Sequence, residues 1–99
     1  MVRISYDREK IAAFCRKWKV KELSLFGSVL RDDFGPASDV DVLVEFAPDA
    51  PWSLFEWMDM IEELKALFGR DVDLVEKGGL RNPFRRHAIL TTREVVYVG

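Results

Sequence analysis

An alternating run of eight residues, from Asp39 to Phe46, constrains the fold of this chain more than any other feature. The run reads Asp-Val-Asp-Val-Leu-Val-Glu-Phe, so a valine occupies three of its alternate positions. Successive side chains of a strand point to opposite faces of a sheet, and β-branched residues are enriched in strands. We therefore predict a strand that buries its valine face and presents Asp39 and Asp41 together on the opposite face.

Turn-forming residues and the spacing of apolar residues divide the rest of the chain into further elements. We expect helices over residues 7–18, 53–68 and 81–90, strands over 22–26, 70–76 and 94–98, and a short helical turn over 29–33. Asp7 and Ser53 are the expected N-caps, and Gly69 is the expected C-terminal stop of the second helix. This order predicts one domain over residues 1–99, in which helices pack mainly on one face of a sheet.

The long helix over residues 53–68 contains more apolar residues than one face can hold. Its core-facing stripe is expected to consist of Leu54, Met58, Ile61, Leu64 and Phe68. Trp52, Phe55 and Trp57 cannot all join this stripe. They either pack around the start of the helix or form an exposed protein interface.

The composition excludes several classes of protein. Hydrophobic residues make up 48% of the chain and charged residues 32%, which is typical of a soluble globular domain. With 15 Lys and Arg against 17 Asp and Glu, the net charge is -2, so the chain lacks the basic excess of proteins that bind nucleic acid stably. No apolar run approaches the roughly 20 residues of a membrane span, and no secretion signal is recognisable. We therefore expect a cytoplasmic protein without a membrane partner, whose one cysteine, Cys15, packs in the core.

Asp39 and Asp41 form the first candidate site on this scaffold. Two residues apart on a strand, they lie about 6.6 Å apart along the backbone on one side, so their carboxylates repel one another. Magnesium suits such a pair, because it binds through one or two carboxylates and is completed by water and substrate phosphates. The alternative is a pair of solvated acids on an exposed sheet face, and spacing alone does not decide between the two.

Gly27 and Ser28 form the second candidate site, at the point where a strand ends. A glycine lets the backbone approach a ligand closely, and free amide groups at the start of a helix favour phosphate. An ordinary turn with a capping serine explains the pair equally well when it is taken alone. Arg31 follows Ser28 by three residues, where it either contacts a phosphate or pairs with a nearby acid.

Together the two candidate sites resemble a known signature. The motif Phe-Gly-Ser at residues 26–28, followed after ten residues by Asp-Val-Asp-Val at 39–42, is similar to that of the DNA polymerase β-like nucleotidyltransferase superfamily. Residues 25–46 resemble most closely its small prokaryotic branch, the minimal nucleotidyltransferases known as MntA-type antitoxins. The resemblance covers essentially the whole chain and implies an α+β (α/β) fold with a mixed β-sheet, similar to the polymerase β palm.

The resemblance implies a role for each member of the motif. Gly27 and Ser28, with Arg31 beside them, would bind the nucleotide triphosphate. Asp39 and Asp41 would bind two Mg²⁺ ions that bridge to it.

A third carboxylate is implied on the strand over residues 70–76. Asp73 matches the family's third acid, which binds metal and helps to position and activate the attacking hydroxyl. Asp71 has the same parity along the strand and is the rival assignment. The alternative for either residue is that it is simply a charged residue at the end of a strand, without a catalytic role.

The resemblance also implies an enzyme, a Mg²⁺-dependent nucleotidyltransferase that moves AMP from ATP to a protein hydroxyl and releases pyrophosphate. In the small branch the acceptor is typically a tyrosine of a partner HEPN-type toxin, so the chain is expected to be the antitoxin of such a pair. Two metal ions about 3.5–4 Å apart suit this transfer because they stabilise the entering and leaving oxygens together. Two other functions stay open: a non-catalytic antitoxin or interaction module, and a nucleotide-binding regulatory domain.

Two features near the end of the chain bear on partners. Arg81, Arg85, Arg86 and His87 form a basic tract, which either grips a partner or a triphosphate or coats a solvated helix. The strand over residues 94–98 is expected to leave an exposed sheet edge, through which two copies could pair as a homodimer.

Overall fold

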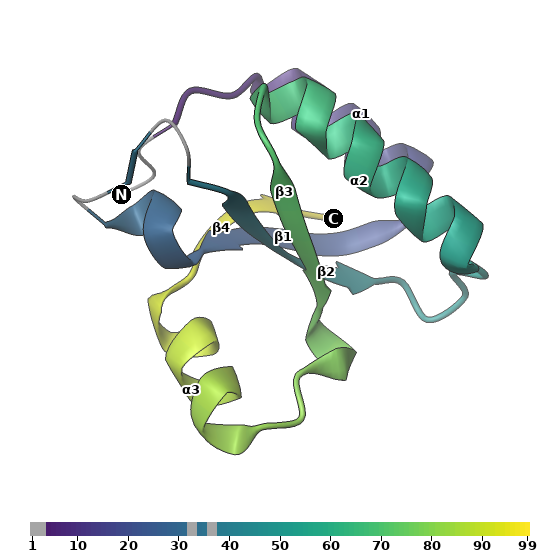
Figure 1. Ribbon diagram of the computed structural model, residues 1–99. Helices are drawn as coiled ribbons and strands as arrows, with labels where there is room; N and C mark the ends of the chain where they lie inside the picture. Colours follow the sequence, from purple (N-terminus) through teal and green to yellow (C-terminus); the bar gives the residue numbers. More distant parts are fainter. Residues whose placement is uncertain (1–3, 32–33, 36–37) are drawn as a thin grey trace.

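The computed structural model describes residues 4–31, 34–35 and 38–99 (Figure 1). Its helices are α1 (Arg8–Lys17), α2 (Leu54–Phe68) and α3 (Pro83–Thr92), and its strands are β1 (Val20–Phe26), β2 (Val40–Phe46), β3 (Val72–Glu76) and β4 (Glu94–Val98). Short 3-10 turns, Gly27–Leu30 and Lys77–Gly79, follow β1 and β3. Each expected helix and strand is present within a few residues of its predicted bounds, and residues 32–33 of the expected helical turn lie outside the described residues. In the described part of the chain, no helix combines the length and apolarity that a membrane span needs.

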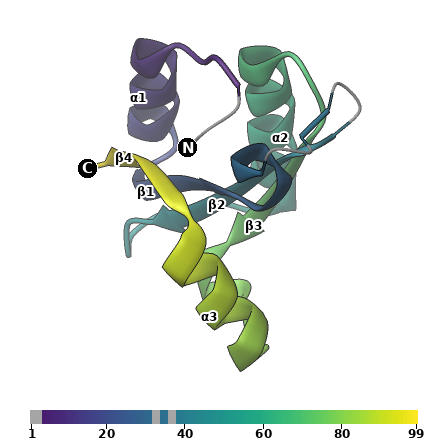
Figure 2. The same cartoon turned by 90° about the vertical axis from the view of Figure 1, so that its left-hand side faces the viewer.

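The four strands form one mixed sheet in the order β3-β2-β1-β4. β1 lies antiparallel to both β2 and β4, whereas β2 and β3 run parallel and are connected through α2. Helices α1 and α2 lie side by side on one face of the sheet, and α3 lies on the other (Figure 2). The α+β class, the mixed sheet and the packing of helices mainly on one face are thus confirmed, and β4 is an edge strand as expected.

Local signals define the ends of the first two helices. The side chain of Asp7 accepts hydrogen bonds from the backbone N–H groups of Glu9 and Lys10, so α1 begins where the sequence predicts. A capping box at Ser53 marks the start of α2. The same helix ends at Gly69, whose φ of 71° lies in the left-handed region that favours glycine.

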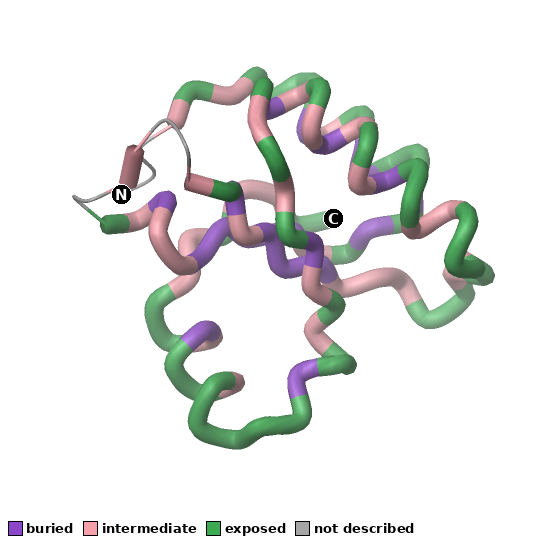
Figure 3. The backbone as a smooth tube through the Cα atoms, in the orientation of Figure 1, coloured by how far each residue is buried: buried purple, intermediate pink, exposed green. Residues whose placement is uncertain are grey.

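The main core lies between the sheet and the helices α1 and α2. It contains the valine face of β2, because Val40, Val42 and Val44 are all buried, and the buried segments concentrate at the centre of the sheet (Figure 3). Cys15 of α1 is buried in the same core, and this burial raises the pKa of its thiol to about 12. A thiol with so high a pKa is a poor nucleophile at neutral pH. Cys15 is therefore a packing residue, as expected.

The predicted core stripe of α2 is wrong at its N-terminal end. Of the five residues expected on it, Leu64 and Phe68 are buried and Ile61 is partly buried. Leu54 and Met58, in contrast, are 71% and 57% exposed. The first turns of α2 are apolar on most sides, so helical spacing alone fits more than one rotation of the helix about its axis.

Aromatic contacts determine which rotation α2 adopts. The ring of Trp57 packs against Phe46 at the end of β2, with ring centroids 6.3 Å apart. The indole N–H of Trp52 donates a hydrogen bond to the carbonyl oxygen of Trp18 at 2.7 Å, and the two rings lie edge to face. Phe55 is 80% exposed. The two tryptophans therefore pack around the start of the helix, and the phenylalanine stays on the surface.

A smaller apolar cluster holds α3 on the opposite face of the sheet. Ile89 of α3 and Leu80 before it pack with Phe26 of β1 and Leu43 of β2. Leu43 lies on the same face of β2 as Asp41, two residues away. The face that carries the acids is therefore partly covered by α3.

Candidate active site

The end of β1 brings Gly27 against Asp41. The strands β1 and β2 are antiparallel with Phe26 opposite Asp41, and the chain turns away from the sheet at the next residue. Gly27 has a φ of 73°, and a Cβ atom built on it would lie 2.3 Å from Oδ2 of Asp41. Glycine alone combines this backbone conformation with so close an approach.

Ser28 links the turn to the segment that carries the acids. Its backbone N–H donates a hydrogen bond to the carboxylate of Asp41. Its hydroxyl donates to the backbone carbonyl oxygen of Asp39 over 3.4 Å. Backbone N–H groups that bind a carboxylate also suit a phosphate oxygen, which is likewise anionic. The turn can therefore serve as an anion site.

β3 places Asp73 beside Asp41, because the two strands run parallel and the two residues are register partners. Burial raises the pKa of Asp41, and the negative charges of Asp73 and Asp39 raise it further. The N–H of Ser28 and the charge of Arg85 on α3 act in the opposite direction. The carboxylates thus repel one another, and a cation held between them would relieve that repulsion.

Asp71, the rival third acid, has different surroundings. Its carboxylate faces α2, where Lys65 Nζ lies 3.7 Å from its Oδ1. Its backbone carbonyl accepts a hydrogen bond from the N–H of Val40 at 2.9 Å. Asp71 therefore aligns the start of β3 with β2, and Asp73 is the acid of this strand that lies next to Asp41.

Arg70 supports the segment that leads into β2, a role that the sequence analysis missed. Its guanidinium donates to the carbonyl oxygens of Gly35 and Ser38 at 2.9 and 3.2 Å, and it lies 4.5 Å from the ring centroid of Phe34. Ser38 directly precedes Asp39, so Arg70 holds the backbone that positions this acid. No local pattern predicts the contact, because its partners are more than thirty residues away in the sequence.

The 3-10 turn begins at Gly27, two residues before the predicted helical turn over residues 29–33, and Arg31 follows its last residue, Leu30, with an extended backbone. The N–H of Arg31 donates to the carbonyl oxygen of Ser28 at 3.0 Å and closes the 3-10 turn. With Gly27, and with Arg93 and Glu94 at the junction of α3 and β4, it lines a hollow of about 490 Å³. This position is compatible with both expected uses of Arg31, a phosphate contact and a pair with an acid.

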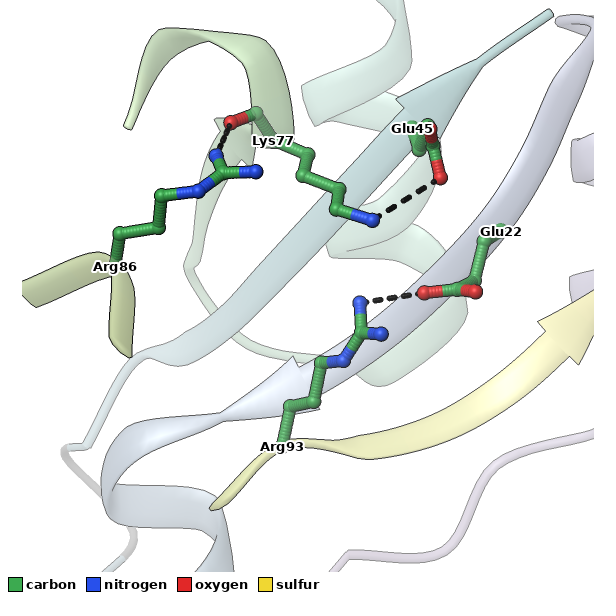
Figure 4. Close-up of polar contacts among 5 residues, drawn as sticks. All are labelled: Glu22, Glu45, Lys77, Arg86 and Arg93. Carbon is green, nitrogen blue, oxygen red and sulfur yellow. Dashed lines mark hydrogen bonds and ion pairs between the residues drawn. The ribbon is translucent and has the colours of Figure 1, made fainter. Parts of the chain in front are cut away.

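The basic tract divides into residues with different surroundings. Arg86 donates to the carbonyl oxygen of Lys77 at 3.0 Å, a structural contact (Figure 4). Arg85 lies close enough to Asp41 for its charge to lower the pKa of that carboxyl. Arg85 is therefore a member of the basic tract that lies near the site, whereas the sequence analysis did not distinguish it from the other three residues of the tract. Its spacing of four residues from the buried Ile89 is the signal that could have found it.

Comparison with known proteins assigns the chain to a family. Residues 8–96 match a family model described as a nucleotidyltransferase domain. The chain belongs to this nucleotidyltransferase family. The protein adenylyltransferase MntA of Thermococcus cleftensis is 40% identical to it over 82 residues, which cover 83% of this chain and 78% of the relative.

Solved structures share the fold of this nucleotidyltransferase. The structure of a candidate minimal nucleotidyltransferase has a TM-score of 0.72 and 30% identity, covering 88% of this chain and 86% of that one. A complex of a tri-AMPylated Shewanella oneidensis HEPN toxin with an MNT antitoxin has a TM-score of 0.64 and 22% identity, covering 93% and 70%. The family resemblance, the fold and the enzyme class implied by the sequence motif are thereby confirmed.

The acids of this nucleotidyltransferase fit a Mg²⁺ site that the substrate completes. Among the residues that the structure describes, no group of three or more His, Cys, Asp or Glu side chains is arranged to hold a metal ion by itself. Mg²⁺ does not need such a group, because it commonly binds through one or two carboxylates and takes its other oxygens from water and phosphates. Asp39 and Asp41 offer these carboxylates beside the turn of Gly27 and Ser28. Burial raises the pKa of Asp41 most, and the repulsion from Asp73 and Asp39 that raises it further favours a cation there.

Proposed function

We propose that this nucleotidyltransferase transfers AMP from ATP to a hydroxyl group of a partner protein in a Mg²⁺-dependent reaction. The observation that carries the proposal is the placement of Asp41 between the turn at Gly27 and the neighbouring strand residue Asp73. A turn that binds phosphate, acids that favour a bound cation and a further acid beside them are the groups that nucleotidyl transfer requires. The relative MntA, a protein adenylyltransferase, supports the choice of acceptor.

Each residue of the site would have a defined task. Gly27 and Ser28 would bind the triphosphate through backbone N–H groups and the serine hydroxyl. Asp39 and Asp41, with Asp73 beside them, would hold Mg²⁺ once water and phosphate oxygens complete its coordination, and the bound ion would stabilise negative charge on the attacking and leaving oxygens. Asp73 would also orient the acceptor hydroxyl and accept its proton. The hydroxyl oxygen then bonds to the α-phosphorus while the bond from that phosphorus to the β-phosphate oxygen breaks, and pyrophosphate leaves.

The proposed acceptor is a tyrosine of a HEPN-type toxin, for which this chain would be the antitoxin. A protein with the same fold occurs in complex with a tri-AMPylated HEPN toxin, which supports this partner class. The surroundings of the site are also suitable. Asp39 and Asp73 are both exposed, so a side chain presented by another protein can reach them.

The experiment that tests this function is a transfer assay with labelled ATP, Mg²⁺ and the product of the neighbouring gene. We expect label on the partner and release of pyrophosphate. Asp39→Asn and Asp41→Asn should each lower the transfer at least about 100-fold, because each removes a charge that stabilises the transition state. Asp49→Asn is the matched control, because this exposed acid pairs only with Lys19 among the described residues and should not change the rate.

Other results would support the alternative functions. Neutralisation of the toxin by Asp39→Asn and Asp41→Asn variants at the wild-type level, without label transfer, would favour an antitoxin that acts by binding alone. Tight ATP binding without release of pyrophosphate would favour a regulatory domain. Either result would overturn the proposed transfer.

A further inference from the structure

Helix α3 is attached to the sheet directly beside the proposed site. Ile89 of α3 packs with Phe26 and Leu43. Phe26 is the cross-strand partner of Asp41, and Leu43 follows Asp41 by two residues on the same face of β2. The side of α3 that carries Ile89 therefore faces the region of the acids.

Arg85 lies on this side of α3. It precedes Ile89 by four residues, so the two side chains lie on one face of the helix, about one turn apart. The charge of Arg85 acts on Asp41 without a direct ion pair between them. The guanidinium therefore lies on the side of α3 that faces the acids, and it forms no ion pair with them.

The neighbouring cations are already engaged in the chain (Figure 4). Arg86 bonds to the carbonyl oxygen of Lys77, Arg93 pairs with Glu22, and Lys77 lies 3.5 Å from Glu45. In residues 4–31, 34–35 and 38–99, no hydrogen bond or ion pair engages the guanidinium of Arg85, whose residue is exposed. Unlike Arg86, Arg93 and Lys77, Arg85 therefore has a guanidinium that is available to bind an anion.

We propose that Arg85 binds the β- and γ-phosphates of ATP, the part of the substrate that leaves as pyrophosphate. This inference rests on the proposed function, because it assumes a triphosphate at the turn of Gly27 and Ser28. The acids would bind near the α-phosphate, where the reaction takes place. Arg85 lies away from the acids, so it would contact the β- and γ-phosphates at the other end of the triphosphate. A guanidinium binds phosphate oxygens through two parallel N–H groups and stabilises the charge that develops on the leaving group.

The test measures binding of three ligands by calorimetry in the presence of Mg²⁺: ATP, AMP and inorganic pyrophosphate. We expect Arg85→Ala to weaken the binding of ATP and pyrophosphate at least about tenfold and that of AMP less than about twofold, because charge-assisted hydrogen bonds are lost only to the terminal phosphates. Arg85→Lys should retain part of the affinity. Arg81→Ala is the matched control, because it removes the same charge from an exposed position in the same tract and should leave all three affinities unchanged.

Three results would overturn the role of Arg85. They are an ATP affinity of Arg85→Ala equal to that of the wild type, an equal loss for AMP and ATP, and an equal loss in Arg81→Ala. Absence of ATP and pyrophosphate binding by the wild type would overturn it as well. The proposed function fails separately, when the wild type binds ATP with the expected dependence on Arg85 but transfers no label.

Discussion

Gly27 and Asp41 form the smallest unit on which the site depends. Because Gly27 has no Cβ, Oδ2 of Asp41 can occupy the space that a side chain would fill. Asp41 is partly desolvated there and lies near two further carboxylates, so its charged form is disfavoured in the metal-free protein. A Mg²⁺ ion that arrives with the nucleotide would relieve this repulsion, which favours binding of the two together.

The first prediction concerns Gly27→Ala. We expect transfer to fall at least about 100-fold, because the new Cβ displaces the carboxylate of Asp41. The free energy of unfolding should fall by about 1–3 kcal/mol, because alanine is strained at a φ of 73°. Transfer assays and urea unfolding measure the two effects. In Gly79→Ala the added Cβ has no atom within 4 Å, so both quantities should stay near wild type. Wild-type activity in Gly27→Ala would contradict the close packing.

The second prediction concerns the pH dependence of stability in Asp41→Asn. The pKa of Asp41 is raised in the folded protein, so its carboxyl stabilises the fold most when protonated, below its unfolded pKa of about 3.9. This contribution is lost as the pH rises through the folded pKa. We therefore expect metal-free Asp41→Asn to be more stable than wild type at pH 7, with the difference shrinking toward pH 3.

Urea unfolding at several pH values, without Mg²⁺, checks this prediction. Asp39→Asn serves as a companion variant, and we expect it to leave the melting temperature of the metal-free protein unchanged or higher, because it also removes a repelling charge. A lower stability of Asp41→Asn at pH 7, or a difference that does not change with pH, would show that burial and repulsion do not disfavour the charged form of this carboxyl.

At the scale of elements, the site depends on segments that are positioned by distant parts of the chain. The approach to β2 is held by Arg70, which lies just before β3. Helix α3 is held by the apolar cluster around Ile89 and by the bond from Arg86 to the backbone of Lys77. Both contacts cross from one element to another, so neither would form in an isolated segment of the chain.

The third prediction concerns Arg70→Ala. Loss of its two hydrogen bonds and of its contact with Phe34 should lower the free energy of unfolding by about 1–3 kcal/mol. Transfer should fall more than about tenfold, because the backbone that positions Asp39 loses its support. Lys65→Ala, which breaks an exposed ion pair with Asp71, should cost less than about 1 kcal/mol. Equal effects of the two variants on activity and stability would contradict the supporting role of Arg70.

At the scale of the whole molecule, the two faces of the sheet have different tasks. One face is packed by α1 and α2 and forms most of the core, while the other carries the acids under the partial cover of α3. The surface also exposes apolar side chains at the start of α2 and along β4, namely Leu54, Phe55, Met58, Val95 and Val98. Pairing of two copies through the edge of β4 stays a prediction.

The fourth prediction concerns stabilisation of the whole fold by substrate. Mg²⁺-ATP at about 100 times its Kd should add about 2.7 kcal/mol to the free energy of unfolding. For a domain of this size, that corresponds to a rise in melting temperature of roughly 10–20 °C. A double Asp39→Asn, Asp41→Asn variant should lose the shift, and Asp49→Asn should keep it. A shift of wild-type size in the double variant, measured by thermal denaturation, would show that ATP binds elsewhere.

Local features of the sequence predicted most of the fold, and they also identified the glycine-serine turn and the two acids of β2 as parts of the candidate site. The alternation of β2 predicted which side chains are buried, because the pleat of a strand assigns faces by parity. Asp7 and Gly69 predicted helix ends, because capping involves only neighbouring residues. The motif of Gly27, Ser28 and the two acids could be recognised because each of its two parts consists of neighbouring residues. Only the number of residues between the two parts had to match as well.

What the tertiary structure decided involves residues far apart in the sequence. It selected the rotation of α2, because packing against Phe46 distinguishes between apolar faces that helical spacing treats alike. It separated Asp73 from Asp71, because strand register, and not parity, determines which acid lies beside Asp41. It also placed Arg70 against the segment before β2 and Arg85 near Asp41. Short-range sterics and periodicity depend only on residues that are close together in the sequence. The distance between two charged side chains from different elements depends instead on the path of the whole chain between them.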